Sequence, residues 1–247
     1  MHYTEHCKAQ GIPSIYRRSP LGDDDFYYTL NEIAEHRSTV LADIEQMSVK
    51  KLSKLYEGMQ RCLDILLSSL GIVIGAIPFL VIAVGIKIDS AGPVFYRQRR
   101  VGRGGKVFQM IKFRTMRRDA ERMTGAVWSA AHDPRVTRVG AFLREVRLDE
   151  IPQLFNILKG QMTFVGPRPE RPEFVYQFTQ YMPAFDRRHD VKPGIAGLAQ
   201  MMNGYDNSAK SIYRKLRWDA QYLRKRCLMT DFFILFRTVV VVLRGAI

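Results

Sequence analysis

Two adjacent carboxylates, Asp149 and Glu150, stand in a strongly basic stretch and are the residues of this chain best suited to chemistry. Arg144 and Arg147 come shortly before them, and Arg168 follows in a segment bounded by prolines. Arginines and divalent cations neutralise phosphate charge, while a carboxylate can attack phosphorus or assist its transfer. We therefore expect these side chains to act on a phosphorylated substrate.

Local rules also give Asp149 a simpler role. Aspartate is a strong N-cap and Pro152 suits a first helical turn, so a helix through residues 151–158 would begin at Asp149. The two roles are compatible, because a helix N-terminus directs free amide groups and a partial positive charge at a bound phosphate.

The charge of the whole chain predicts a polyanionic partner. Lysine and arginine number 38 against 24 aspartates and glutamates, which gives a net charge of +14 in 247 residues. Anionic lipids and nucleotide diphosphates fit this charge, whereas nucleic acid is not expected because no helix-turn-helix, zinc-finger spacing or RNA-binding aromatic motif is present. Three cysteines without metal-ligand or redox spacing are expected to be reduced thiols.

An uncharged apolar segment over residues 65–86 indicates contact with a membrane. As a helix it would extend about 33 Å at ~1.5 Å per residue, against ~30 Å for an apolar bilayer core. Pro78 predicts a kink near Ile77–Pro78, with Ser68 or Ser69 hydroxyls as partners for the freed backbone groups.

The flanks of this segment favour a hairpin over a simple span. Both flanks are basic, and positive charge marks the cytoplasmic side of a membrane, so a re-entrant hairpin in the cytoplasmic leaflet satisfies both. A single span remains the second possibility. A buried core helix of a soluble protein is the third, and it is disfavoured because the segment has no polar face. The first residues do not have the order of a cleavable signal peptide.

The rest of the chain predicts a small hairpin and loop-built surfaces. Residues 94–96 and 107–111 flank the glycine-rich stretch 102–105 and indicate a β-hairpin, since the glycines do not have P-loop spacing. Repeated prolines predict a rigid, irregular surface over residues 155–204. The apolar run 232–243 is too short to cross a bilayer and is expected to be a helix that packs on the domain or lies at the membrane interface.

Several motifs occur in one order over residues 59–247 and resemble the bacterial sugar transferases, the small single-domain polyprenyl-phosphate sugar-1-phosphate transferases, also called phosphoglycosyl transferases. The strings are Arg61-Cys62-Leu63-Asp64, Gly92-Pro93-Val94-Phe95-Tyr96-Arg97-Gln98, Lys112-Phe113-Arg114-Thr115-Met116, Leu148-Asp149-Glu150-Ile151-Pro152-Gln153-Leu154-Phe155-Asn156, Gly166-Pro167-Arg168-Pro169-Glu170 and Lys192-Pro193-Gly194-Ile195. Many members carry a Gly-Arg step after the Ala-Gln that stands here as Ala199-Gln200, and this chain does not.

The resemblance implies transfer of a sugar 1-phosphate from a nucleotide diphosphate sugar, expected to be a UDP-sugar, to polyprenyl (undecaprenyl) phosphate, with release of UMP. Such a reaction initiates exopolysaccharide, capsule, O-antigen or glycoconjugate synthesis. It implies that Asp149 attacks the β-phosphorus to form an aspartyl phosphosugar and that Glu150 assists as a metal-side or acid/base partner. Mg²⁺ is the implied cofactor, with Asp149 and Glu150 as its ligands. The implied substrate and phosphate-binding residues are Arg144, Arg168, Lys112, Arg114, Gln153, Asn156 and Lys192.

The combined expectation is an α+β, mainly helical, membrane-associated domain with a re-entrant helix broken at Pro78 and a small β-hairpin. Residues 1–58 are expected to be a polar, partly disordered extension, 59–90 the membrane hairpin, and 91–247 a cytosolic catalytic region with interfacial helices. The resemblance places the protein in the cytoplasmic membrane with its site facing the cytosol, with other glycan-assembly enzymes as possible partners. A non-catalytic adaptor that binds anionic lipids and a transferase that moves the sugar without its phosphate are the alternatives.

Overall fold

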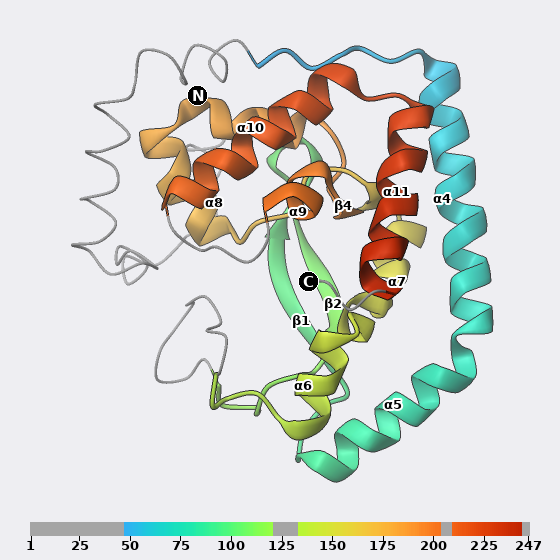
Figure 1. Cartoon of the computed structure of the whole chain (residues 1–247). Helices are drawn as coiled ribbons and strands as arrows, with labels where there is room; N and C mark the ends of the chain where they lie inside the picture. The colour runs from blue at the N-terminus through green and yellow to red at the C-terminus, as the bar shows by residue number, and fades with distance from the viewer. Residues whose placement is uncertain (1–46, 121–132, 204–208, 244–247) are drawn as a thin grey trace.

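Residues 47–120, 133–203 and 209–243 are described by a computed structural model, shown in Figure 1. Most of the predicted extension 1–58 lies outside these residues. The described part of the chain is mainly helical and contains one small antiparallel sheet, as predicted. A second pair of strands, parallel and only three residues each, was not predicted.

The apolar segment forms two helices that meet at a sharp bend. Helix α4 (Lys54–Ile74) and helix α5 (Ala76–Asp89) are bent by 60° at Gly75. The predicted position of the break was Ile77–Pro78. The bend lies one turn earlier because the proline ring at position 78 crowds the carbonyl of Ile74 and offers it no N–H, so Pro78 is accommodated in the first turn of a new helix.

The backbone at the bend finds partners within the helices themselves. The amide of Gly75 donates to the Gly71 carbonyl at 2.9 Å, and the amide of Phe79 donates to the Gly75 carbonyl at 2.8 Å. The Ser68 hydroxyl, one of the two expected partners, donates instead to the carbonyl of Asp64, one turn back in α4.

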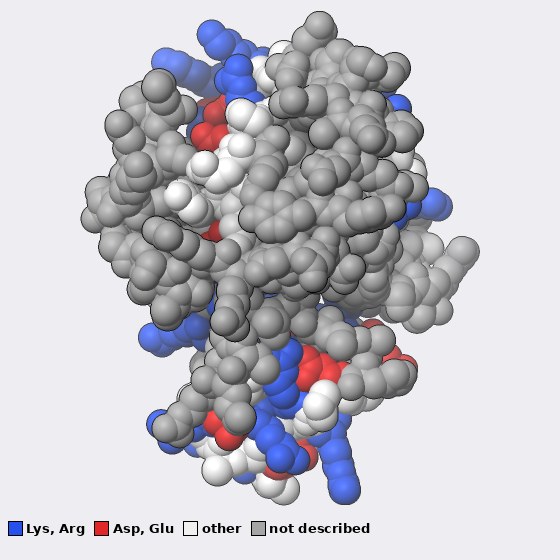
Figure 2. Space-filling view, turned by 90° about the vertical axis from the view of Figure 1, so that its left-hand side faces the viewer, with Lys and Arg blue, Asp and Glu red and all other residues white. Residues whose placement is uncertain are grey.

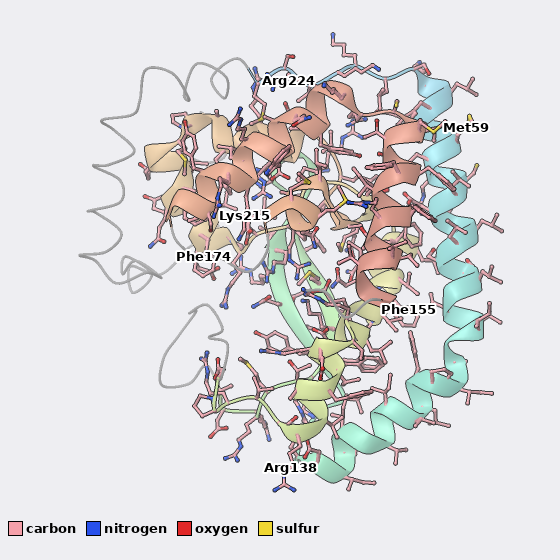
Figure 3. All side chains as sticks on the ribbon, viewed as in Figure 1. Met59, Arg138, Phe155, Phe174, Lys215 and Arg224 are labelled. Atoms are coloured by element: carbon pink, nitrogen blue, oxygen red, sulfur yellow. The ribbon has the colours of Figure 1, made fainter. Side chains whose placement is uncertain are left out.

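The outer faces of α4 and α5 are apolar and exposed, as the side chains on the outer edge of the molecule in Figure 3 show. None of the described helices is by itself long and apolar enough to cross a membrane, whereas α4 and α5 together reach that length and composition as a bent pair. The exposed apolar side chains of the pair include Leu55, Leu66, Leu70, Val73, Ile74, Ile77, Leu80, Val81, Val84 and Ile88.

The inner face of α4 is fixed to the short helix α7 (Leu154–Leu158). Arg61 donates to the carbonyls of Ile157 and Leu158 at 2.8 and 2.7 Å. Farther along, Gly71 lies so close to Leu154 that a Cβ at position 71 would be 2.9 Å from a Leu154 methyl group. These two contacts form what we call the α4–α7 seam.

The predicted hairpin is confirmed. Strand β1 (Phe95–Val101) pairs antiparallel with β2 (Val107–Phe113), from Phe95 opposite Phe113 to Val101 opposite Val107. The connecting turn η2 (Arg103–Gly105) places Gly104 at φ 65°, a left-handed conformation that suits glycine. Lys112 lies opposite Tyr96, near the end of the hairpin remote from this turn.

The main core lies among the C-terminal helices and the parallel strand pair, above the hairpin in Figure 1. Its buried side chains include Val175, Phe178, Leu216, Leu223 and Ile234. The elements that supply or cover it are β3 (Thr163–Val165), α8 (Pro172–Tyr181), η4 (Pro183–Asp190), β4 (Gly194–Ala196), α9 (Leu198–Asn203), α10 (Ala209–Lys225) and α11 (Leu228–Leu243).

Helix α11 covers the apolar run that was expected to be helical, and it begins four residues earlier, at Leu228. It packs on the domain through Ile234, which is fully buried, while Phe232, Phe233 and Phe236 are exposed. Its Asp231 accepts hydrogen bonds from Tyr56 of α4 and Tyr222 of α10, so the buried carboxylate joins three helices. The packed face agrees with one of the two expectations for this segment.

Candidate functional site

The acidic pair lies in a tight 3-10 turn, η3 (Leu148–Gln153), which leads into α7. The prediction that Asp149 is the N-cap of a helix is wrong. Arg147, in a left-handed conformation with φ 59°, precedes the turn, and Asp149 is already inside it. Both carboxylates lie close to strand β2, where Lys112 is located.

Glu150 is held by two cations. Its carboxylate forms a two-point ion pair with the Arg168 guanidinium, at 2.5 and 3.1 Å, and contacts the Lys112 ammonium at 2.7 Å. Burial opposes its ionisation, yet the charges and hydrogen bonds of Arg168 and Lys112 outweigh burial and hold the pKa of Glu150 well below its ordinary value. Glu150 is therefore ionised at neutral pH.

Asp149 is in a different electrostatic environment although it is the adjacent residue. It is only 7% exposed, and the Lys112 ammonium lies 4.0 Å from its carboxylate. Burial raises the pKa of Asp149 above its ordinary value, and the charge of Glu150 adds to the rise against the opposing effect of Lys112. Asp149 is thus the carboxylate of the pair whose ionised form is less stabilised.

Arg144 completes the cationic surround of the pair. It lies in helix α6 (Arg138–Glu145), and its Nε donates to the Thr115 hydroxyl at 2.8 Å. Burial lowers the pKa of Arg144, and the charge of Asp149 opposes that shift, which places the two side chains in the same electrostatic neighbourhood. The structure therefore brings Arg144, Lys112 and Arg168, from three separate segments, around the acidic pair.

Arg114 does not join this group. Its guanidinium donates to the carbonyl of Ser90 at 2.6 Å, to the Ser90 hydroxyl at 3.0 Å and to the carbonyl of Ile86 at 3.3 Å. It therefore fixes the C-terminal end of α5 to the hairpin. Lys112 lies within strand β2, which ends at Phe113, so Arg114 lies beyond the strand and its side chain follows a different course.

Asn156 and Gln153 lie in the framework under the pair. The Asn156 amide donates to the carbonyl of Gln109 at 2.7 Å and accepts from the amide of Ile111 at 3.0 Å, which ties α7 to β2. Gln153 is fully buried, and its amide has no hydrogen-bond partner among the described residues. Lys192 lies elsewhere, in a cavity beside α4. Substrate binding by these three residues stays a prediction.

A buried ionic network behind Arg168 was not predicted from the sequence. Arg188 donates to the backbone carbonyl of Arg168 at 2.9 Å and forms an ion pair with Asp219 at 2.7 Å. Arg100 donates to the carbonyl of Pro169 at 2.8 Å and contacts Glu170 at 3.4 Å. These contacts hold the proline-rich loop so that Arg168 meets Glu150. The residues come from a strand, a 3-10 helix and α10, so their proximity depends on the tertiary fold.

The substitution Asp219→Asn is expected to remove a pH dependence of stability. Burial raises the pKa of Asp219 from 3.8 to about 6, although Arg188 opposes the rise. The folded state then binds a proton at Asp219 more tightly than the unfolded state does. The stabilisation that this proton provides is complete below pH 3.8 and is lost as the pH rises through about 6. The wild type should therefore lose stability relative to Asp219→Asn over that interval, measured as the free energy of unfolding against pH.

The exposed carboxylate Asp190 provides the control for this experiment. The free energy of unfolding of Asp190→Asn should change with pH as that of the wild type does over the same interval. If the free energy of unfolding of Asp219→Asn also follows that of the wild type, the carboxyl group of Asp219 does not change its proton affinity on folding.

Asp149 and Glu150 are two carboxylates, which fit a metal ion that is bound together with a substrate better than one that is bound by protein side chains alone. Among residues 47–120, 133–203 and 209–243, no cluster of three or more histidine, cysteine, aspartate or glutamate side chains could hold a metal ion. Mg²⁺ commonly binds through one or two carboxylates together with substrate phosphates. Asp149 and Glu150 provide oxygen donors of that kind.

Comparisons with known proteins agree with one another. A family model described as "Bacterial sugar transferase" matches residues 55–245. The UDP-N-acetylgalactosamine-undecaprenyl-phosphate N-acetylgalactosaminephosphotransferase of Aeromonas hydrophila is 42% identical over 193 residues, which are 78% of this chain and 45% of that protein. The UDP-glucose:undecaprenyl-phosphate glucose-1-phosphate transferase of Xanthomonas campestris pv. campestris is 42% identical over 167 residues, or 66% of this chain and 34% of that protein.

A shorter relative is matched over most of its own length. The exopolysaccharide production protein PSS of Rhizobium leguminosarum bv. phaseoli is 37% identical over 190 residues, which are 74% of this chain and 94% of that protein. The chain thus spans less than half the length of the Aeromonas and Xanthomonas relatives and nearly all of the Rhizobium one.

Proposed function

The chain belongs to the bacterial sugar transferase family, and on that premise we propose that it transfers a sugar 1-phosphate from a UDP-sugar to undecaprenyl phosphate. The names of the Aeromonas and Xanthomonas relatives describe this type of reaction, and the name of the Rhizobium relative describes exopolysaccharide production. The observation that carries the proposal is the acidic pair itself, in which a buried Asp149 stands beside a Glu150 that holds two cations.

In the proposed reaction, a carboxylate oxygen of Asp149 attacks the β-phosphorus of the UDP-sugar. The bond between that phosphorus and the bridging oxygen breaks, and UMP leaves with the bond's electron pair. The resulting aspartyl phosphosugar is attacked by a phosphate oxygen of the lipid, which regenerates Asp149 and yields a lipid diphosphate sugar. Such covalent catalysis divides one displacement into two and gives ping-pong kinetics.

The cations around the pair support this chemistry. Arg144, Arg168 and Lys112 can offset the charge of the diphosphate as the carboxylate approaches it. Glu150 keeps Arg168 and Lys112 in position, and its low pKa favours this role over proton donation. Mg²⁺, which we propose is held by Asp149 and Glu150, would add charge neutralisation at the diphosphate when bound.

We further propose that α4 and α5 form a re-entrant hairpin in the cytoplasmic membrane, with the acidic pair facing the cytosol. The 60° bend, the exposed apolar outer faces and the basic flanks support this arrangement. It would place the site where a soluble sugar nucleotide meets a lipid phosphate. Residues 59–90 would then be the membrane segment and residues 91–247 the catalytic region, which could receive its donor or pass on its product beside other glycan-assembly enzymes.

The first experiment is to identify the nucleotide released from a panel of UDP-sugars. The purified protein, in nanodiscs with undecaprenyl phosphate and Mg²⁺, should release UMP from at least one of them and label the lipid with both sugar and phosphate. Release of UDP would indicate transfer of the sugar alone and overturn the proposal. If no sugar nucleotide reacts, the adaptor alternative, which the comparisons do not support, would be favoured.

A further inference from the structure

A cavity of about 170 Å³ lies between the first turns of α4 and the domain, apart from the acidic pair. Its polar lining also includes Gln60 and Thr163. Four cations face two carboxylates in its walls, so its lining has an excess of positive charge. These charged residues are Glu57, Arg61, Asp64, Arg103, Lys192 and Arg226.

The walls of this cavity are fixed by contacts within the protein. Arg61 is anchored by its two carbonyl partners in the α4–α7 seam. Asp64 is buried and accepts from the Thr163 hydroxyl at 2.9 Å and the Phe164 amide at 3.3 Å. The Tyr222 hydroxyl oxygen lies 3.1 Å from the carbonyl oxygen of Val165. A preformed polar cavity loses little conformational entropy when a ligand enters.

Arg226 brings to the lining a buried N–H group without a hydrogen-bond partner in the described part of the chain. It is 8% exposed, and its Nε has no hydrogen-bond partner among the described residues. Its guanidinium carbon lies 6.0 Å from the centre of the Tyr56 ring, and its charge also acts on the buried Asp231 carboxylate. A buried N–H without an acceptor is costly, so the combination of this side chain and a cationic cavity indicates an anionic ligand.

We propose that this cavity binds a phosphate group, at a site distinct from the acidic pair. Guanidinium and ammonium groups are the protein's strongest donors to phosphate oxygens, and the cavity contributes three arginines and one lysine. The phosphate belongs to an anionic phospholipid headgroup or to a soluble phosphate compound. The headgroup is favoured because the cavity adjoins the start of α4, whose other face is apolar.

The test is the thermal stability of the full chain in a neutral detergent. Inorganic phosphate and short-chain phosphatidylglycerol are titrated separately, with chloride at matched ionic strength as the reference, because a ligand of the folded state raises Tm. At least one of the two should raise Tm beyond chloride. Arg226→Gln and Arg103→Gln should each weaken that binding about tenfold, the effect of losing one hydrogen bond between charged groups.

Two further variants serve as controls. Arg224→Gln removes one positive charge from an exposed position of α10 (Figure 3) and should bind like the wild type. Arg168→Gln alters the acidic pair's surround and should also retain the shift in Tm, which separates the cavity from the proposed active site.

The outcomes distinguish the source of the phosphate. A response to phosphatidylglycerol alone assigns the site to a lipid headgroup, and a response to inorganic phosphate assigns it to a soluble compound. The proposal fails if neither raises Tm beyond chloride, or if Arg226→Gln and Arg103→Gln respond like the wild type. Should Arg226→Gln not fold, Arg103→Gln decides, because its side chain is 54% exposed and lies in the hairpin turn.

Discussion

Asp149→Asn is expected to lower UMP release by roughly 10³-fold or more, because the amide cannot attack phosphorus and no other described carboxylate has its position. The substitution keeps the size of the side chain, so Glu150 and its two cations should stay in place. The measurement is the initial rate of UMP release with saturating UDP-sugar and lipid phosphate. A denatured wild-type sample quenched before lipid is added should carry radioactive sugar phosphate, and Asp149→Asn should carry none.

Glu145 offers a matched control for this substitution, since it is an exposed carboxylate at the end of α6, four residues before Asp149. Glu145→Gln should release UMP at close to the wild-type rate. If Asp149→Asn is as active as Glu145→Gln, then Asp149 is not the nucleophile and the covalent mechanism is wrong.

Glu150→Gln is expected to destabilise the folded protein by about 3 kcal/mol at neutral pH, because it leaves the partly buried Arg168 and Lys112 side by side without their shared anion. The pH dependence follows from the low pKa of Glu150. A carboxylate whose pKa is depressed by folding stabilises the protein above its ordinary pKa, here 4.5, and that stabilisation is lost as the pH falls toward the folded value. The difference in free energy of unfolding between wild type and variant should therefore become smaller at acidic pH, as measured by chemical unfolding.

A double-mutant cycle separates the ion pair from other effects of the substitution. The double variant Glu150→Gln, Arg168→Gln should lose clearly less free energy of unfolding than the sum of the losses of the two single variants, since each single variant already breaks the same ion pair. Strict additivity would show that the two side chains do not stabilise one another in solution.

The sequence predicted the parts of the site that depend on composition and local order. The acidic pair, the basic neighbours and the hairpin that carries Lys112 were all expected, and the structure brings Lys112, Arg144 and Arg168 around the pair. The hairpin was predictable because a glycine-rich turn between two apolar runs fixes its register locally.

The features that the sequence did not predict depend on long-range packing or on one backbone angle. Arg147 adopts a left-handed conformation although it is not glycine, and it precedes a 3-10 turn where a helix cap was predicted. The strands β3 and β4 are too short to show alternation. The contact of Arg188 with Asp219 joins η4 to α10, and no local spacing signals it.

The α4–α7 seam has a consequence for how the protein would meet its lipid. Helix α7 follows the acidic pair in the chain. Arg61 and Gly71 of α4 contact α7 directly. If α4 lies in the bilayer, the rigid packing of α7 on α4 then fixes the distance of Asp149 from the membrane surface. Such a protein would select its acceptor by the height at which the lipid presents its phosphate, and the length of the hydrocarbon tail beneath would matter little.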